Sequence, residues 1–203
     1  MGIPISLPGL SQFIKEIPDG SIVSIEGGVD PPKAVLVGSL VSTAKENGWN
    51  VSYVCPRGRC GSLQSLTGMW RDDMAIVEGD APTLWKDHMK TKTVLIIDSI
   101  SYLLQDYEIS EFKQLMEEMK VTSRITGAIV IQLVELGMFD HRTEILSGFY
   151  ADGIIQFLAK ESGEGLSRFI RIPKWMTGSS YDRNIYFTYE EGRINIDLRY
   201  RVV

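Results

Sequence analysis

The sequence predicts an α/β protein whose central sheet is mostly parallel, is flanked by helices and is extended by antiparallel strands at its C-terminal edge. In the first part of the chain, apolar runs of strand length alternate with amphipathic segments of helix length. Residues 93–99 form the clearest run, which ends in Asp98 and suits the buried middle of a parallel sheet. Residues 168–198 instead alternate between faces around the turn Glu191-Gly192, which is typical of β-hairpins.

The same patterns place each strand in the chain. A short lead-in at residues 7–17 ends at the turn Pro18-Asp19-Gly20. Strands are expected at residues 21–26, 50–55, 74–78, 93–99, 128–134, 152–159, 168–173, 185–189 and 193–198. The crossovers between parallel strands are expected to be right-handed. Since no linker and no repeat interrupts the pattern, residues 1–203 are expected to form a single domain.

Helices are predicted where apolar side chains recur on one face. The helix after the glycine pair at residues 27 and 28 ends at Asn47-Gly48, and its apolar face consists of Leu36, Val37, Leu40, Val41 and Ala44. A helix at residues 110–123 carries Phe112, Leu115, Met116 and Met119 at helical spacing. Shorter helices are expected at residues 81–90, capped by Asp80, and at 143–150. Residues 56–73 suggest only one or two helical turns.

Composition excludes several classes of protein. The chain has 203 residues, of which 44% are hydrophobic and 23% are charged, and its net charge of −5 argues against nonspecific coating of nucleic acid. No apolar run reaches the ~18 residues that a membrane helix requires, and the N-terminus lacks the pattern of a signal peptide. A cytoplasmic protein without membrane association is therefore expected. Because Cys55 and Cys60 are too few for a four-ligand zinc site and His88 and His141 lack ligand spacing, no metal site is expected.

The glycine pair opens a degenerate phosphate-binding loop. The phosphate-loop template is G-x-x-x-x-G-K-[ST] between a strand and a helix, and within residues 27–34 only Gly27 and Lys33 match it. Pro32 replaces the second glycine and offers no backbone N–H to a phosphate. Ala34 replaces the hydroxyl that would ligate Mg²⁺. Two working parts of the loop are therefore missing.

A second interpretation of the loop needs no nucleotide. Asp30 followed by Pro31 is a good helix start, with Asp as the N-cap and Pro at the first helical position. The Asp30 carboxylate would then occupy the helix N-terminus, where a phosphate otherwise sits. The role of Lys33 also has two interpretations: it can hold a phosphate, or it can be a solvated or Asp-paired lysine at a helix start.

Taken together, these stretches resemble the RecA-like ATPase fold, and specifically its KaiC-like branch in archaea and bacteria. Residues 7–21 resemble the family's approach to the loop, and Tyr53-Val54 stands in the place of a family strand. Asp98 stands in the place of the Walker B aspartate, and Ala-Asp-Gly-Ile-Ile at residues 151–155 resembles a further family stretch. The resemblance implies a RecA-like P-loop NTPase fold over nearly the whole chain.

The resemblance also implies the positions of the site residues. The vestigial nucleotide site consists of Gly27, Gly28, Asp30, Lys33, Asp98, Ser99 and Gln132. Asp98 would hold Mg²⁺ through water, or would cap Ser99 or the loop backbone. Gln132 lies where RecA-like proteins sense the γ-phosphate. In the family a Lys-x-Arg reaches the γ-phosphate of the neighbouring subunit, so Lys174, with Arg171, supplies the expected inter-subunit cations.

The departures from the family fall where its chemistry takes place. A glutamate pair after the second strand orients the attacking water in the family, and its positions here are approximately Pro56, Arg57 and Gly58. The arginine of Lys-x-Arg falls on Met176 or, in the other register, on Thr177. Together with the changes in the loop, these departures alter the loop glycine, the Mg²⁺ ligand, the water-orienting carboxylate and the cation from the neighbour. Loss of such an arginine alone lowers the rate by about 10³–10⁵.

These observations predict a catalytically inactive or very weak ATPase homologue that acts as a binding, scaffold or regulatory subunit in a ring-type or filament-type assembly. Its expected partners are copies of itself or active RecA-like paralogues. The expected cofactor is none, or ATP or ADP held weakly. One alternative is a slow ATPase that draws its Mg²⁺ ligand and base from Asp30, Glu26 or Asp98. Another is a recombination accessory protein that binds single-stranded DNA, which requires a basic groove with aromatic stacking.

Overall fold

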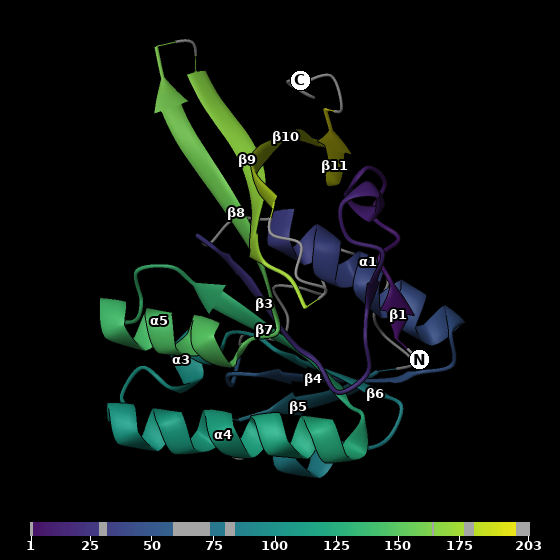
Figure 1. Cartoon of the computed structure of the whole chain (residues 1–203), viewed down its shortest axis with the longest axis vertical. Helices are drawn as coiled ribbons and strands as arrows, with labels where there is room; N and C mark the ends of the chain where they lie inside the picture. Colours follow the sequence, from purple (N-terminus) through teal and green to yellow (C-terminus); the bar gives the residue numbers. More distant parts are fainter. Residues whose placement is uncertain are drawn as a thin grey trace.

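The computed structural model describes residues 2–28, 32–58, 74–79, 84–163, 165–176 and 181–197. The strands are β1 (Ile3–Pro4), β2 (Glu16–Ile17), β3 (Ile22–Gly27), β4 (Asn50–Cys55), β5 (Ala75–Glu78), β6 (Thr93–Ile97), β7 (Ile129–Glu135), β8 (Gly153–Ser162), β9 (Gly165–Lys174), β10 (Tyr181–Glu190) and β11 (Arg193–Ile196). The helical segments are η1 (Leu10–Gln12), α1 (Pro32–Glu46), η2 (Lys86–His88), α3 (Ile100–Leu103), α4 (Ile109–Thr126) and α5 (His141–Tyr150). Figure 1 shows how these elements are arranged.

The large sheet confirms the predicted α/β class. Its strand order is β11-β10-β9-β8-β3-β7-β6-β4-β5. Every pair from β8 through β3, β7, β6 and β4 to β5 is parallel. The pairs that join β8, β9, β10 and β11 are antiparallel. The C-terminal part of the chain therefore adds its hairpins to one edge of a parallel sheet, as the sequence predicts (Figure 1).

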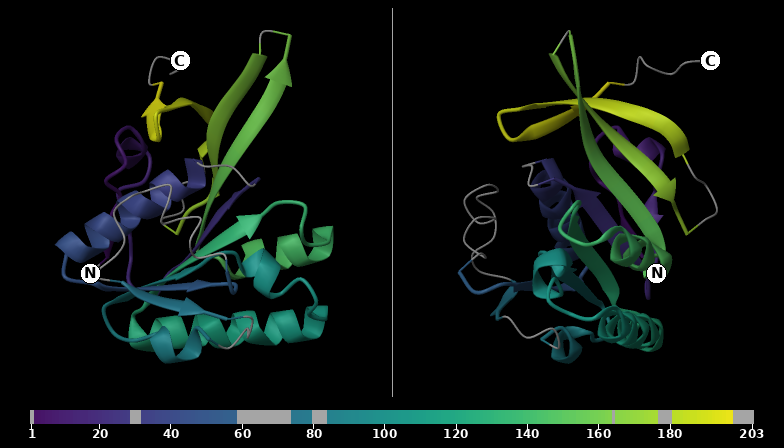
Figure 2. Two further views of the ribbon diagram at one scale, coloured as in Figure 1. Left: turned by 180° about the vertical axis from the view of Figure 1, so that it is seen from behind. Right: turned by 90° about the vertical axis from the view of Figure 1, so that its left-hand side faces the viewer.

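Helices cover both faces of the parallel strands (Figure 2). On one face Leu36 and Leu40 of α1 pack in a core with Ile25 of β3. On the other face Phe112 and Met116 of α4 pack with Ile22, β7 and α5. This arrangement explains why the central strands read as continuous apolar runs, since both of their faces are buried. Within the described part of the chain, no helix is both long and apolar enough to cross a membrane.

The C-terminal hairpins give the molecule its elongated shape. Strands β8 and β9 form a long ribbon that projects beyond the sheet, and β10 and β11 curl back beside α1 and the lead-in (Figures 1 and 2). Ile155 of β8 and Ile172 of β9 are buried in the same core as α1, whereas Leu166 near the tip of the ribbon is exposed. The base of the ribbon therefore belongs to the core and its tip does not.

Several elements differ from their predictions: β8, β9 and β10 are longer than expected, and the helical segments η2, α3 and α4 differ as follows. Of the predicted helix at 81–90, the described residues form only the single turn of η2. This one turn is enough to bury Trp85 and Met89, so a longer helix with a longer apolar face is not needed. Helix α3 was not predicted, since it is one turn whose start depends on a hydrogen bond from the Tyr102 N–H to the Ser99 Oγ. Helix α4 is longer than 110–123 because Glu108 forms a capping box at its start and Gly127, with a φ of +74°, ends it.

Candidate functional site

The candidate site lies where β3, β6 and β7 end and α1 begins. These strands are neighbours in the parallel sheet, so their carboxyl ends meet at one edge. In open α/β sheets this edge is the usual place for a ligand. The described residues there are the end of β3 at Gly27 and Gly28, the start of α1 with Lys33, and the ends of β6 and β7.

Gly27 allows three parts of the chain to approach one another closely. A Cβ atom at this position would lie 2.8 Å from the Phe157 carbonyl oxygen of β8 and 3.3 Å from the Lys33 Cδ. The glycine is therefore required by packing as well as by the loop motif. Gly28 is exposed, and a Cβ atom there would meet nothing within 4 Å. Asp30 and Pro31 lie outside the described residues, so the N-cap hypothesis stays a prediction.

Lys33 is buried and forms an ion pair within its own chain. Its Nζ lies 2.7 Å from the Glu135 Oε2, and the two side chains are 6% and 15% exposed. The same Nζ lies 3.5 Å from the Gly27 carbonyl oxygen. Without a phosphate, Lys33 was expected to be either solvated or paired with an aspartate. In the structure it is paired, and its partner is a glutamate, Glu135 of β7. A phosphate at this position has to compete with the Glu135 carboxylate for the same ammonium group.

Glu135 is a site residue that sequence reasoning missed. It is the last residue of β7, and its backbone N–H donates to the Ser101 Oγ at 2.9 Å. Ser101 is fully buried, which fixes the strand end and so the base of the glutamate side chain. The available signal was the position of an acidic residue directly after a buried apolar strand, the same signal that identified Asp98.

Asp98 follows β6 at the same edge of the sheet. The hydroxyl of the buried Tyr53 donates a hydrogen bond to the Asp98 Oδ2, and burial, together with this carboxylate, raises the pKa of Tyr53. Ser99 uses its own hydroxyl to cap α3, accepting from the Tyr102 N–H at 3.3 Å. Asp98 therefore lies at the carboxyl end of β6, and its carboxylate is already in contact with a protein donor. Its role as a Mg²⁺ ligand stays a prediction.

Gln132 lies deeper than the edge of the sheet. It pairs in register with Ser24 of β3 and Ile97 of β6, it is fully buried, and β7 continues beyond it to Glu135. Its Nε2 donates to the Ser147 Oγ of α5 at 3.2 Å, and its Oε1 has no hydrogen-bond partner among the described residues. Its role as a phosphate sensor also stays a prediction.

Glu26 belongs to a polar layer between the sheet and α5. Its carboxylate accepts from the Ser24 Oγ at 3.1 Å and from the Gln156 Nε2 at 2.9 Å. Burial raises the pKa of Glu26, the two hydrogen bonds oppose that rise, and the charge of Glu144 adds to it. The Glu26 carboxylate therefore already accepts two hydrogen bonds from its own chain, and these would compete with its suggested use as a catalytic base.

The predicted inter-subunit cations lie away from the loop of their own chain. Lys174 ends β9 and donates to the carbonyl oxygens of Gly148 and Phe149 at 3.1 Å each, where it complements the C-terminal end of α5. Arg171 donates its Nε–H to the Asn184 Oδ1 at 2.8 Å and lies over the ring of Phe169. Contact with a neighbouring subunit stays a prediction for both residues.

The described residues fit a magnesium nucleotide poorly. The ammonium of Lys33 is paired with a carboxylate, Pro32 is the first residue of α1 and has no N–H, and Ala34 offers no oxygen to a metal. No group of three His, Cys, Asp or Glu side chains converges on a metal position in the part of the chain that the structure describes. The described residues hold a lysine in place and can exclude an anion, and among themselves they lack most of the donors that phosphoryl transfer requires.

Comparison with known proteins identifies the fold. The sequence matches no protein-family model and no curated protein. Among solved structures, the flagellar accessory protein FlaH from Methanocaldococcus jannaschii is 21% identical with a TM-score of 0.72, and the alignment covers 97% of this chain and 98% of FlaH. The KaiC-like protein PH0186 from Pyrococcus horikoshii OT3 is 19% identical with a TM-score of 0.76, over 97% and 99% of the two chains. The chain therefore has the RecA-like fold in the form that KaiC-like proteins share.

Proposed function

We propose that this chain is a RecA/KaiC-like protein that hydrolyses ATP very slowly or not at all and serves as a binding, scaffold or regulatory subunit of an assembly. In this proposal it acts in the cytoplasm, as one domain, with copies of itself or with active RecA-like paralogues. The observation that carries the proposal is the buried pair of Lys33 and Glu135, which occupies the lysine of the phosphate loop.

The charges explain why this pair opposes nucleotide binding. Two unit charges of like sign 4 Å apart repel by about 4 kcal/mol at an effective dielectric constant of about 20. A triphosphate that approaches Lys33 would meet the Glu135 carboxylate at such a distance. It would also find no N–H at Pro32 to offset the repulsion. Weak binding of the triphosphate, together with the absence of the arginine that stabilises the transition state in the family, supports a role without appreciable catalysis.

The scaffold part of the proposal has more general support. RecA-like folds present different surfaces at the two ends of the sheet, and contacts between unlike surfaces lead to rings or filaments. One structural neighbour is described as a flagellar accessory protein, which is a precedent for this fold in a supporting role. Sedimentation of the purified chain, alone and mixed with an active RecA-like paralogue, tests whether it assembles. A monomer under both conditions contradicts this part.

A titration tests the nucleotide part of the proposal. ATP is added to the protein with and without Mg²⁺, heat is measured by calorimetry, and phosphate release is followed in parallel. We expect weak heat that does not depend on Mg²⁺ and phosphate release at background. Tight Mg²⁺-dependent binding with steady release would favour the second candidate, a slow ATPase. That candidate is supported by the position of Asp98 directly after β6, where the resemblance to the family expects a Walker B aspartate.

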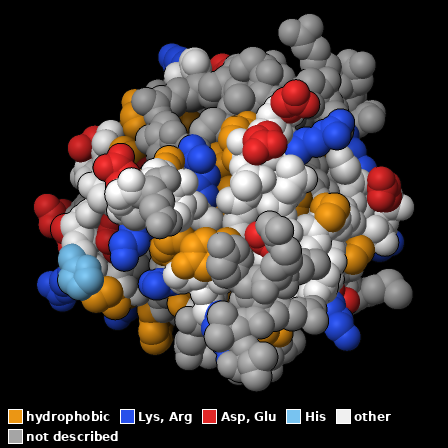
Figure 3. Space-filling view, turned by 90° about the horizontal axis from the view of Figure 1, so that it is seen from above, with side chains coloured by type: hydrophobic (Ala, Val, Ile, Leu, Met, Phe, Trp, Pro, Cys, Tyr) orange, Lys and Arg blue, Asp and Glu red, His pale blue; other side chains and the backbone are white. Residues whose placement is uncertain are grey.

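The surface bears on the single-stranded DNA alternative. On the face seen from above in Figure 3, Lys and Arg side chains are interspersed with Asp and Glu, and hydrophobic side chains form small groups between them. A groove for single-stranded nucleic acid needs cations that follow the backbone, with aromatic rings for the bases. The described residues on this face do not form such a continuous basic track, so we keep the scaffold role as the proposal.

A further inference from the structure

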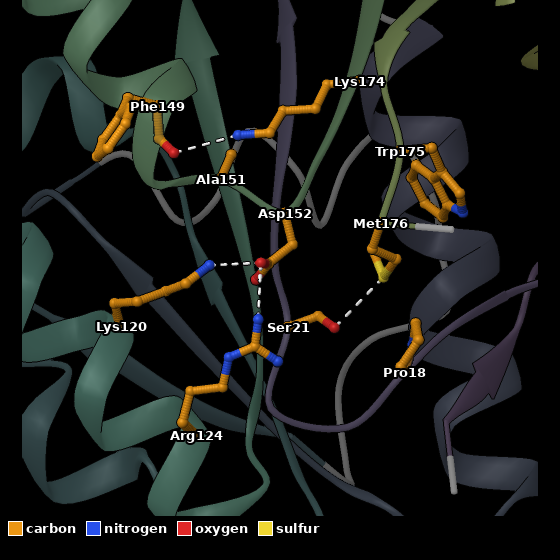
Figure 4. A pocket seen from close by; sticks show the side chains of 10 residues that line it. All are labelled: Pro18, Ser21, Lys120, Arg124, Phe149, Ala151, Asp152, Lys174, Trp175 and Met176. Carbon is orange, nitrogen blue, oxygen red and sulfur yellow. Dashed lines mark hydrogen bonds and ion pairs between the residues drawn. The ribbon is translucent and has the colours of Figure 1, made fainter. Parts of the chain in front are cut away.

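A surface cavity lies at the end of the sheet opposite the phosphate loop. Its volume is about 550 Å³, and it is bordered by α4, by the C-terminal end of α5 and by the end of β9 (Figure 4). The lining residues that carry charge or a large ring are Lys120, Arg124, Asp152, Lys174, Phe149 and Trp175. No part of the nucleotide site contributes to it, so it requires a separate explanation.

The cavity carries more positive than negative charge. Asp152 accepts from the Lys120 Nζ at 2.5 Å and from the Arg124 guanidinium at 2.8 Å. Its second oxygen accepts from the backbone N–H of Ile22 at 2.9 Å, so this carboxylate is fully engaged. Among the described lining residues, three cations thus surround one carboxylate. This local excess contrasts with the net charge of −5 of the whole chain.

Lys174 supplies the charge that Asp152 does not directly neutralise. Its Nζ is bonded to backbone carbonyl oxygens of α5 and is directed along the upper side of the cavity (Figure 4). Burial lowers the pKa of Lys174, the charge of Lys120 lowers it further, and Asp152 opposes both effects. An anion in the cavity would relieve the repulsion between the two lysines and would favour the charged form of Lys174.

An exposed apolar surface adjoins these cations. The Phe149 side chain is 71% exposed at the rim of the cavity, and Ile145, one turn earlier on α5, is 62% exposed. Residues four apart in a helix lie on one face, so the two side chains form a continuous apolar strip. The side chain of Arg124 is 54% exposed and is directly accessible to a partner. Cations beside an aromatic anchor are typical of the residues that dominate binding energy in protein interfaces.

We propose that this cavity and the outer face of α5 bind an acidic segment of a partner protein. A carboxylate of the segment lies among Arg124, Lys120 and Lys174, and an apolar side chain of the segment packs on Phe149 and Ile145. Charge complementarity selects the acidic partner, and the apolar strip extends the contact beyond what a small anion would fill. The proposal goes beyond the proposed function and does not depend on the state of the phosphate loop.

Single-stranded nucleic acid fits the same surface less well. Such a ligand needs cations spaced along its backbone over several nucleotides. Here Lys120 and Arg124 converge on one carboxylate and Lys174 is bonded to the end of α5, so the three cations do not follow a track. In addition, the aliphatic side chain of Ile145 offers no planar face on which a base can stack. A peptide with one or two carboxylates next to an apolar residue matches this arrangement better.

Fluorescence anisotropy with a defined probe tests the proposal. The probe is a short fluorescein-labelled peptide composed of Glu, Leu and Phe, and its matched control has Gln in place of every Glu. We expect the Glu peptide to bind and the Gln peptide to bind at least about tenfold more weakly, with an affinity for the Glu peptide that falls as NaCl is added. Equal binding of the two peptides, or no binding of either, overturns the proposal.

Variants of the lining residues locate the binding. We expect Arg124→Gln and Lys174→Gln each to weaken binding by about tenfold, and Phe149→Ala by at least about threefold. Lys160→Gln and Leu166→Ala, on the projecting ribbon, are the matched controls and should leave binding unchanged. Because Arg124 and Phe149 are exposed, their variants should fold normally, and circular dichroism checks this even if Lys174→Gln weakens α5. Unchanged binding in folded Arg124→Gln and Phe149→Ala overturns the proposal.

Competition experiments distinguish the acidic peptide from the other possible ligands of the cavity, nucleic acid and small anions. Oligothymidylate that displaces the peptide at lower concentration than unlabelled peptide would identify a nucleic-acid site and overturn the proposal. Citrate or inorganic phosphate that competes as well as unlabelled peptide would identify a small-anion site and would also overturn it. Displacement by unlabelled Glu peptide alone supports it. None of these measurements includes ATP, so a failure here is distinct from a failure of the proposed function.

Discussion

Lys33 and Glu135 lie 102 residues apart in the sequence, and their charged groups lie 2.7 Å apart in the structure. The pair joins the first turn of α1 to the last residue of β7. Each partner offsets part of the cost of burying the other, because a buried ion without its counterion is strongly destabilising. This mutual dependence leads to the first prediction.

Glu135→Gln should lower the free energy of unfolding by about 3 kcal/mol, since it leaves the buried ammonium group of Lys33 without a counterion. Sulfate should restore much of that loss, because an anion that binds only the folded protein stabilises it. Urea denaturation with and without sulfate measures both effects. The control is the double variant Lys33→Met/Glu135→Leu, which should be close to the wild type and insensitive to sulfate. If sulfate stabilises the wild type as much as Glu135→Gln, then Glu135 does not occupy the anion position.

Phosphate release from ATP should be at background in the wild-type protein. The reason is the combined loss of the loop glycine, the Mg²⁺ hydroxyl, the water-orienting carboxylate and the cation from the neighbour. A coupled phosphate assay compares the wild type with Asp98→Ala, and the two should be indistinguishable. Steady release that disappears in Asp98→Ala would show that the protein is an ATPase that uses Asp98.

The affinity for ATP should be weak and nearly independent of Mg²⁺. Ala34 cannot ligate the ion, and Pro32 removes a donor from the phosphate cradle. Calorimetry with MgCl₂ and then with a chelator measures the dependence. The matched variant Pro32→Gly/Ala34→Thr restores both groups and should tighten binding in the presence of Mg²⁺ by about tenfold. Micromolar binding by the wild type that collapses with the chelator would mean that another residue has taken over the metal.

The buried carboxylate of Glu26 should make stability depend on pH. Its pKa is raised above the ordinary value of 4.5, chiefly by burial, so the folded protein holds this proton more tightly than the unfolded chain does. The resulting stability is complete below the ordinary pKa and is lost as the pH rises through the folded pKa. Relative to Glu26→Gln, the wild type should therefore lose stability as the pH rises above the ordinary pKa of 4.5. Denaturation curves of both proteins below and above this pH measure the difference, and a constant difference would contradict the prediction.

Local patterns were sufficient to predict most of the fold. The spacing of Leu36, Val37 and Leu40 identified α1, and all three side chains are buried. The strand at residues 50–55 was placed at the observed bounds of β4, and the C-terminal hairpins were assigned to the edge of the sheet, where they lie. These features follow from the periodic burial of side chains, which the spacing of apolar residues in the sequence indicates directly.

The candidate site was only partly predictable because its contacts depend on strand register. The sequence identified Lys33, but its partner Glu135 is selected by the alignment of β7 beside β3, in which Glu135 lies opposite Gly27. Similarly, Lys174 was assigned from a family motif, whereas its contacts with α5 depend on how β9 returns along β8. No local pattern specifies such long-range pairings, and hydrogen-bonded single turns such as α3 are too short to show a period.

The projecting ribbon of β8 and β9 has a practical consequence for work with this protein. Near its tip Ala159 pairs with Arg168 and Lys160 pairs with Ser167, and Ala159, Lys160 and Ser167 are exposed to solvent. Strand amides in this part of the ribbon should exchange with deuterium well before those of β3, which lies between two helical layers. The tip is therefore a suitable place to insert an affinity tag or a fluorophore, since a label there leaves both ends of the sheet accessible.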